Sequence, residues 1–500
     1  MKIQPILQIV TPAQWIEAAR SARDSGGRLV ALWGTDDRDR DGRFAVLAAF
    51  ATLAGVSVVK LPLQPDEAYP DISGLFTPAI RMQRALRDLL GIEAAGARDT
   101  RPWFRHGGWR DDEFPLRRDF ERSPPARSPA SDYRFVRVEG DGVHEIAVGP
   151  IHAGIIEPGH FRFSVVGEKV LRLEERLGYT HKGIDRRFQD FTIAEGHRLA
   201  SRVSGDSAVA FQWAYAQAAE AACGIEAPPR ARWLRALMLE RERVANHLGD
   251  LGAIGNDAAF AFALSQFMRL KEDWLRWGAR AFGHRLAMDR IVAGGVDADL
   301  AEPHAGELLA LCDAVEREVR ELRDIFDESS SLQDRFITAG ILTPAQAREF
   351  GVTGLAGRAS GQAFDLRADL PCDPYGVLGV RKVVYAAGDV ATRVKVRFEE
   401  LAEALRLIGE IIRGMPAGAL RAPLPHPASG AFGVGFVEGW RGETFVALEA
   451  GADGSIRRCH AHDPSWQAWP ALEHAVIGNI VPDFPLINKS FNFSYSGGDG

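Results

Sequence analysis

The sequence predicts an α+β protein in which a small α/β domain precedes a large, mainly α-helical domain that begins with β structure. Strand-like and helix-like patterns alternate over residues 1–120, which is typical of an α/β unit. Residues 121–132 read ERSPPARSPASD, and their prolines among serine and arginine predict an extended linker. Long helical patterns dominate residues 133–500, so we place the second domain there.

Composition and charge argue against several classes of protein. The chain has 500 residues, enough for two or three domains with a large core. Its net charge of −7 and its lack of a long basic run argue against a nucleic-acid partner. The four cysteines lie far apart and none forms a CxxC pair, so we expect neither a zinc site nor a disulfide framework, and a reducing compartment fits. The first residues lack the basic and apolar regions of a signal peptide.

The elements of the first domain can be predicted in order. Thr11 followed by Pro12 is typical of a helix start, and the strand RLVALWGTD follows at 28–36. Residues 44–59 form the most apolar run, but these 16 residues fall short of the roughly 20 that span a bilayer. We therefore expect a helix there that leads into a buried strand. Residues 82–90 predict a short amphipathic helix that ends at a glycine.

The second domain begins with a predicted β-hairpin at 161–178, where polar and apolar residues alternate. A charged turn at 181–185 and a helical run ending at Arg202 are expected next. A short β segment is expected near 432–448. Apolar residues at helical spacing predict five long helices, at 208–222, 230–251, 258–283, 302–329 and 394–413.

Three polar residues of the second long helix allow two interpretations. Glu240, Arg243 and His247 recur on a helix whose apolar residues face the core. They form either a solvated helix edge or a buried polar network at the centre of a bundle.

The order of motifs from 149 to 207 carries a family resemblance. A turn with two histidines and a carboxylate (His152, Glu157 and His160) precedes the hairpin, the HKGID turn and the segment RVSGDS. This order resembles the large subunits of membrane-bound, energy-converting nickel–iron hydrogenases of the formate-hydrogenlyase type. It is also similar to the quinone-site (D) subunit of respiratory complex I. Further motifs follow in the same order as in that family: GHRLAMDRIVAGGV, GLAGRASGQAFDLR, GDVATRVKVRFEE and FVEGWRGE.

The first domain carries a weaker resemblance. RDLLGIE followed by PLRRDF resembles the C subunit of complex I, a docking domain without a cofactor that some energy-converting hydrogenases fuse to the large subunit. An ordinary helix and loop of mixed charge is the alternative for this segment.

The resemblance implies four metal-ligand positions, and this sequence has no cysteine at any of them. The two CxxC pairs of the family fall on Ser204 and Ser207, and on Ser494 and Gly497. Thiolate sulfur suits such metals, whereas a hydroxyl stays protonated and glycine offers no side chain. We therefore expect no metal and no cofactor in this chain, with these four positions lining a vacated pocket.

A quinone site is the second ligand that the resemblance suggests. His152 in GPIHA matches the histidine that contacts the quinone head group in complex I. The Asp-Tyr pair of that family falls on Ser204-Gly205, so the head group loses its second hydrogen-bond anchor. Quinone is thus a candidate ligand with only half of its expected anchors.

Several groups around this pocket match functional positions of the family. Glu157 matches a proton-transferring carboxylate, and we expect a buried carboxyl between two histidines, for which a structural salt bridge is the alternative. Arg441 matches an arginine above the metal, where it would bind an anion or an aspartate. His181 and Asp185 match an HKG-E pattern with Asp in place of Glu. For His160 we favour a satisfied core histidine.

Three functional hypotheses follow from the resemblance. The first is a subunit without a NiFe centre that couples electron transfer or proton relay to an ion-translocating membrane arm. The second is a redox subunit that reduces quinone or another small acceptor, and the third is a scaffold without chemistry. None of them makes the chain by itself an active hydrogenase, although the complex would be an oxidoreductase of the NADH:quinone or hydrogenase-4 type.

The resemblance also implies partners and a location. The expected partners are an iron–sulfur small subunit similar to the complex I B subunit, a ferredoxin-like subunit and antiporter-like membrane subunits. Iron–sulfur clusters are expected in a partner only. We expect a cytoplasmic chain held at the inner face of the cell membrane through these subunits.

Overall fold

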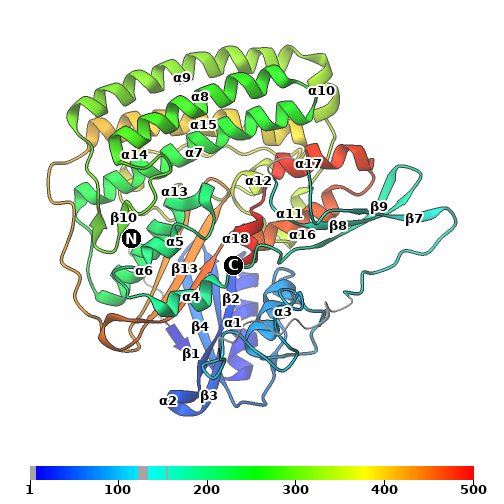
Figure 1. Cartoon of the computed structure of the whole chain (residues 1–500), viewed down its shortest axis with the longest axis vertical. Coiled ribbons are helices and arrows are strands. Elements are labelled where there is room, and N and C mark those ends of the chain that lie inside the picture. The colour runs from blue at the N-terminus through cyan, green and yellow to red at the C-terminus, as the bar shows by residue number, and fades with distance from the viewer. Residues whose placement is uncertain (1–6, 122–132, 154–155) are drawn as a thin grey trace.

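The computed structural model describes residues 7–121, 133–153 and 156–500, and it confirms the predicted α+β fold. In Figure 1 the N-terminal sheet lies at one end, the long helices lie at the other, and a second sheet runs between them. The predicted linker at 121–132 lies almost entirely outside the described residues.

The N-terminal domain is a four-stranded sheet with strand order β1-β4-β3-β2, flanked by helices. Thr11 and Gln14 form a capping box at the first helix, as its sequence predicted, and Gly91 ends the third helix with φ of 71°. The elements are β1 (Leu7–Ile9), α1 (Pro12–Asp24), β2 (Arg28–Asp37), α2 (Arg38–Asp41), β3 (Arg43–Thr52), β4 (Gly55–Leu63), β5 (Tyr69–Pro70), α3 (Ala79–Leu90) and β6 (Ala94–Ala95).

The expected helix within 44–59 is wrong, because this run forms strand β3, a turn and the start of β4. Strand β3 pairs with β2 on one side and with β4 on the other, and eight of its ten residues are buried. A strand buried on both faces reads as a continuous apolar run, and periodicity does not separate it from a buried helix.

The second domain begins with a three-stranded antiparallel sheet of β7 (Val143–Val148), β8 (His160–Val166) and β9 (Lys169–Arg176). The predicted hairpin is confirmed as β8 and β9, and β7 is an additional strand. The predicted helical run before Arg202 is wrong, since only short pieces form there: α4 (Ile184–Arg187), η1 (Phe188–Asp190) and α5 (His197–Ala200). Gly196 separates them where the chain passes so close to Tyr215 that a Cβ would lie 2.3 Å from the hydroxyl oxygen.

Long helices form a bundle over the rest of the domain (Figure 1). They are α6 (Ala208–Cys223), α7 (Pro229–Asp257), α8 (Ala261–Phe282), α9 (Glu302–Glu328) and α15 (Val390–Gly414), all close to their predicted ranges. Within the described residues, none of the helices combines the length and the apolarity that crossing a bilayer requires. Shorter elements complete the domain: η2 (Gly205–Ser207), β10 (Ile291–Val292), β11 (Gly295–Val296), α10 (Ser330–Phe336), α11 (Pro344–Glu349), α12 (Gly354–Ala359), α13 (Leu366–Asp369), α14 (Tyr375–Leu378), η3 (Ala452–Gly454), α16 (Ser465–Ala475), η4 (Val481–Asp483), α17 (Phe484–Phe491) and α18 (Tyr495–Asp499).

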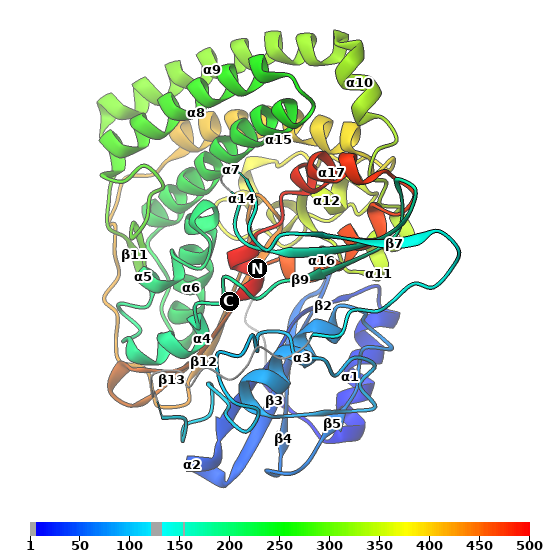
Figure 2. The ribbon, with the colours of Figure 1, turned by 45° about the vertical axis from the view of Figure 1, so that its right-hand side comes forward.

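A central antiparallel sheet joins the two domains. It consists of β12 (Phe432–Glu438), β13 (Glu443–Ala450) and β14 (Ile456–His462), so the predicted short β segment gains a third strand. Helix α6 lies so close to β12 that a Cβ on Gly435 would be 1.8 Å from the Ala214 carbonyl oxygen. Trp33 of the N-terminal sheet packs with Phe445 of β13 in one apolar cluster. In Figure 2 the two sheets meet below the helical bundle.

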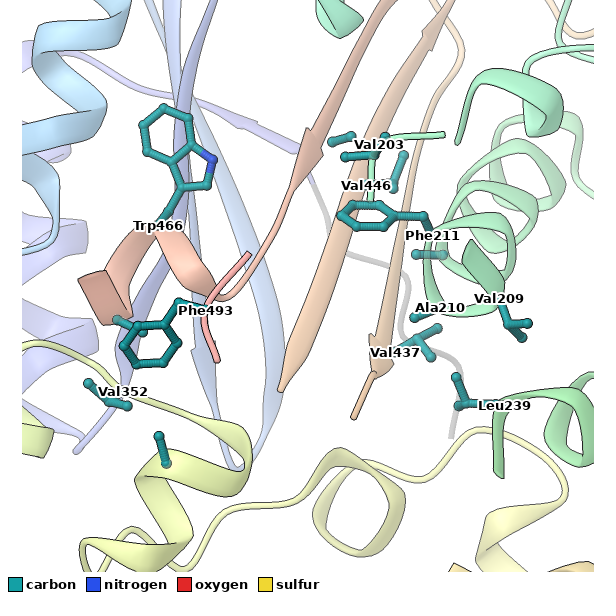
Figure 3. Close-up of a cluster of buried hydrophobic side chains, with 14 of the residues drawn as sticks. Val203, Val209, Ala210, Phe211, Leu239, Val352, Val437, Val446, Trp466 and Phe493 are labelled. Atoms are coloured by element: carbon teal, nitrogen blue, oxygen red, sulfur yellow. The ribbon is translucent and has the colours of Figure 1, made fainter. Parts of the chain in front are cut away.

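Buried apolar side chains anchor two segments that are distant in sequence. Figure 3 shows Val203 and Phe211 directed toward Val446 of β13, and Phe493 lying on the same side of the sheet as Trp466. Val203 precedes Ser204, and Phe493 precedes Ser494. The apolar core thereby fixes the backbone on either side of the predicted ligand positions.

Candidate functional site

The four positions that correspond to metal ligands come together in space, and we call them the substituted centre: Ser204, Ser207, Ser494 and Gly497. The Ser204 and Ser494 hydroxyl oxygens lie 2.9 Å apart and share a hydrogen bond, although 290 residues separate them. The Ser494 hydroxyl also caps α18 by accepting the Gly497 N–H at 2.9 Å. All three serines are at least 96% buried.

The other two positions are filled by neighbouring polar groups. The Ser207 hydroxyl accepts a hydrogen bond from Arg441 Nη1 at 3.3 Å. A Cβ on Gly497 would lie 2.4 Å from Asp463 Oδ2, so the Asp463 carboxyl takes the space beside this backbone. The centre is therefore closed by oxygen atoms and a guanidinium.

Arg441 forms an ion pair with Asp206, which lies between the first two serines. The turn between β12 and β13 carries Arg441, and its two terminal nitrogens donate to the two Asp206 carboxylate oxygens at 2.6 and 2.5 Å. Burial acts to raise the pKa of Asp206, but the Arg441 guanidinium and the Ser204 hydroxyl outweigh it and lower that pKa. The alternative predicted for Arg441, an aspartate partner, is the one that the structure shows.

Two further buried carboxyls lie beside the centre, and neither contacts an arginine of the described chain. Asp463 is 1% exposed, its Oδ1 accepts the Ser465 N–H at 2.8 Å, and its Oδ2 has no hydrogen-bond partner among the described residues. Asp499 is fully buried and accepts hydrogen bonds from Gly178 and from the Thr180 backbone and hydroxyl. Burial raises the pKa of Asp463 and raises that of Asp499 to about 6.

The predicted buried carboxyl between two histidines is wrong, because Glu157 is exposed and each histidine binds its own turn. His152 Nε2 lies 2.7 Å from the Gly159 carbonyl oxygen, and His160 Nδ1 lies 3.1 Å from the Gly149 carbonyl oxygen. Glu157 Oε2 accepts the Ser496 N–H at 3.1 Å, so its carboxylate contacts the helix that carries Gly497. The histidines fix the loop, and Glu157 lies at the surface above the centre.

His181 and Asp185 have separate surroundings. His181 Nδ1 lies 2.7 Å from the Asp499 carbonyl oxygen, next to the centre. Asp185 instead accepts from Arg458 and His460, each at 2.8 Å, and His460 stacks on Trp33 of the N-terminal domain. Asp185 therefore contacts the junction between the domains rather than the substituted centre.

Of the two interpretations of helix α7, the buried network is the correct one, and we call it the bundle network. Glu240, Arg243 and His247 are each fully buried. Arg367 Nη1 lies 3.1 Å from Glu240 Oε2, and His247 Nε2 lies 3.2 Å from Glu400 Oε2. The complete network comprises Glu240, Arg243, His247, Arg358, Asp365, Arg367, Glu400 and Glu438.

Three carboxyls of the site, Asp206, Asp463 and Asp499, were not predicted from the sequence. Asp206 lies inside the motif RVSGDS, and Asp499 follows Gly497 by two residues, so both carried a positional signal. Asp463 begins DPSWQAW, and only the fold brings it beside Gly497.

The donor atoms of the substituted centre do not fit a nickel–iron site. Three hydroxyls and a glycine stand where four soft thiolates are required. The cysteines, Cys223, Cys312, Cys372 and Cys459, are all free and far apart in sequence. Among the residues that the structure describes, no cluster of three or more His, Cys, Asp or Glu side chains has metal-binding geometry.

Comparisons with known proteins match both domains. Residues 8–126 match the family model of the respiratory-chain NADH dehydrogenase 30 Kd subunit, and residues 254–429 match that of the 49 Kd subunit. The chain is 28% identical to the C/D subunit of NADH-quinone oxidoreductase from Bacteroides thetaiotaomicron over 493 residues, which is 92% of each chain.

Two relatives from Escherichia coli K12 are more similar in sequence. The chain is 31% identical to formate hydrogenlyase subunit 5 (94% of this chain, 84% of the relative) and 30% identical to hydrogenase-4 component G (94% and 83%). Its fold is similar to a chain of the membrane-bound sulfane sulfur reductase, an archaeal respiratory membrane complex. That match has a TM-score of 0.68 at 23% identity and covers 72% of this chain and 99% of the other. The paired domains, the order of motifs and these relatives show that the chain belongs to the family of hydrogenase large subunits that contains formate hydrogenlyase subunit 5 and hydrogenase-4 component G and is related to the C/D subunit of NADH-quinone oxidoreductase.

Proposed function

We propose that the chain is a component of a membrane-associated energy-converting complex that works without a nickel–iron centre and couples electron transfer in its partners to an ion-translocating membrane arm. The observation that carries this proposal is the intact convergence of four ligand positions with oxygen donors in place of sulfur. The fold around the centre is retained, whereas the chemistry that would bind nickel is replaced. Names of relatives that include a membrane-bound complex support the setting.

The partners in this proposal supply the redox chemistry. An iron–sulfur small subunit and a ferredoxin-like subunit would carry electrons, and antiporter-like membrane subunits would carry ions. The chain would be held at the inner face of the membrane through these partners. The names of the hydrogenase and NADH-quinone oxidoreductase relatives support such an assembly.

Within the chain, Glu157 and Asp499 are the groups that we propose for proton relay. Glu157 is exposed and contacts α18, whereas Asp499 is buried at the end of the same helix. Burial is the largest reason that the pKa of Asp499 rises to about 6, and the nearby Glu157 charge raises it further. A carboxyl that titrates near neutral pH is suited to binding and releasing a proton.

Quinone reduction fits the residues less well. His152 Nε2, the nitrogen that a quinone carbonyl would need, already donates to the Gly159 carbonyl. Gly205 offers no hydroxyl as a second anchor. We therefore place quinone behind the coupling function and treat a scaffold without chemistry as the outcome that an experiment must exclude.

The test uses the purified complex, with nickel content and ion translocation per electron measured on the same samples. We expect no stoichiometric nickel, and we expect Glu157→Gln and Asp499→Asn each to lower ion translocation severalfold. Glu168→Gln is the matched control, because Glu168 is exposed in the β8–β9 turn away from α18. Stoichiometric nickel would overturn the proposal, and unchanged translocation in both variants would leave only the scaffold.

A further inference from the structure

A pocket of about 870 Å³, its mouth included, opens beside the substituted centre. It lies between α7, α8 and the loop after α8, and Gly205 and Asp206 form part of its lining. Asp206 separates the pocket from the contact between Ser204 and Ser494, since its Oδ1 accepts the Ser204 hydroxyl at 2.8 Å. Much of the wall is apolar: Val209, Met238, Ala245, Trp274, Leu275, Leu286 and Ala287.

Arg241 lines this pocket as a buried cation without an acidic partner among the described residues. It is 4% exposed, its Nη2 donates to the Trp274 carbonyl at 2.9 Å, and its Nε has no hydrogen-bond partner in the described chain. The guanidinium lies 4.4 Å from the Trp277 ring centroid, a contact that offsets part of the cost of burial. A buried charge is costly unless an opposite charge reaches it, so Arg241 makes the pocket electropositive.

Lys271 is a second cation of the pocket that no described side chain neutralises. Its ammonium lies against α7 at Gly249, where a Cβ would be 2.5 Å from Nζ, so the missing side chain makes room for the charge. In the described parts of the chain Lys271 makes no hydrogen bond or ion pair. Asp206, which Lys271 attracts, is already bound by both terminal nitrogens of Arg441.

The remaining acidic group, Glu242, does not cancel these charges near neutral pH. Its Oε2 accepts the Val209 N–H at 2.6 Å at the start of α6. Burial raises the pKa of Glu242 to about 8 against the lowering effect of these backbone hydrogen bonds, so the group is largely a neutral acid at pH 7. At the mouth, Arg285 pairs with Glu272. The interior therefore holds two cations and a wall of apolar side chains.

We propose that this pocket binds a small amphiphilic organic anion, with its carboxylate at Lys271, its apolar body on Trp274, Leu275 and Leu286, and Arg241 adding to the positive potential. The cavity has the size of ordinary small-molecule sites, and it combines apolar walls with a few polar groups, as such sites do. The ligand would lie against Asp206, next to the substituted centre. This inference does not depend on the coupling function proposed above.

Calorimetric titration of the full chain with octanoate, and with octan-1-ol as the uncharged probe, tests the proposal. We expect octanoate to bind at least tenfold more tightly than octan-1-ol and Lys271→Met to remove that difference. Arg276→Met is the matched control, because it removes one cation from the exposed side of the same helix. It should change the dissociation constant less than twofold.

A second variant tests the apolar wall without touching a charge. Leu286→Asn, in the loop after α8, should weaken octanoate at least threefold, and thermal melting of each variant reports whether it is folded. Equal binding of the two probes, or equal effects of Lys271→Met and Arg276→Met, would overturn the proposal. Octanoate binding to the chain that disappears in the assembled complex would also overturn it, because a partner's acidic side chain would then occupy the pocket.

Discussion

The substituted centre and the bundle network are both buried and polar, yet their carboxyls are in different charge states. In the bundle network, Arg358 contacts Glu400 and Arg367 contacts Glu240, and these arginines lower the pKa of both carboxyls against the effect of burial. Beside the centre, Asp463 and Asp499 contact no arginine of the described chain, and burial raises their pKa. The counter-ion, rather than the depth of burial, decides which buried carboxyl can exchange a proton.

Exceptions in each region follow the same rule. Asp206 at the centre is bound by Arg441, and its pKa is lowered. Glu438 in the network shares Arg358 with Glu400, and burial together with the Asp365 charge raises the pKa of Glu438 to about 7. One arginine between two carboxylates thus leaves one of them close to titration.

The largest expected effect concerns the arginine that the bundle network shares. Arg358→Met leaves Glu400 and Glu438 buried without their guanidinium, so we expect a loss of about 3–5 kcal/mol in the free energy of unfolding. Denaturant unfolding of the full chain measures it. Arg320→Met, which removes an exposed pair with Glu316, should cost only about 0.3–0.5 kcal/mol. Equal losses in the two variants would contradict the view that the network stabilises through paired charges.

An intermediate effect is expected from the titration of Asp499. Its pKa is about 6 in the folded chain and 3.8 as the reference value, so the folded state holds a proton that the unfolded state releases. The stabilising contribution is complete below about pH 4 and declines as the pH rises to about 6, by up to about 3 kcal/mol. Thermal melting of the wild type and Asp499→Asn across this range should show a shrinking difference in stability. A difference that grows with pH would show that Asp499 is held ionised, as in the network.

The smallest effect is expected for the hydroxyl pair of the centre. Ser494→Ala removes both the Ser204 hydrogen bond and the cap of α18, so we expect a loss of about 1–2 kcal/mol. Ser204→Ala leaves the cap intact and should cost about 0.5–1.5 kcal/mol. Melting curves of the two variants rank them, and a larger loss for Ser204→Ala would show that the cap contributes little.

The sequence predicted the helices and the convergence of the centre better than it predicted the chemistry around that centre. Periodic apolar residues located α7 and α15, and the spacing of motifs implied that Ser204 and Ser494 would meet. Strand β3 was missed because burial on both faces removes its alternation. The exposure of Glu157 and the burial of Asp463 depend on loop packing between segments more than 300 residues apart, which no local pattern encodes.

Gly497 has a consequence for the evolutionary reversal of this centre. A cysteine at that position would place its Cβ where Asp463 Oδ2 now lies, and the carboxyl would have to give up its contact with the Ser465 N–H. Restoring thiols at all four positions would therefore leave an acid inside the metal's coordination space. A return to nickel chemistry needs a fifth change, at Asp463, and that requirement makes the loss difficult to undo one mutation at a time.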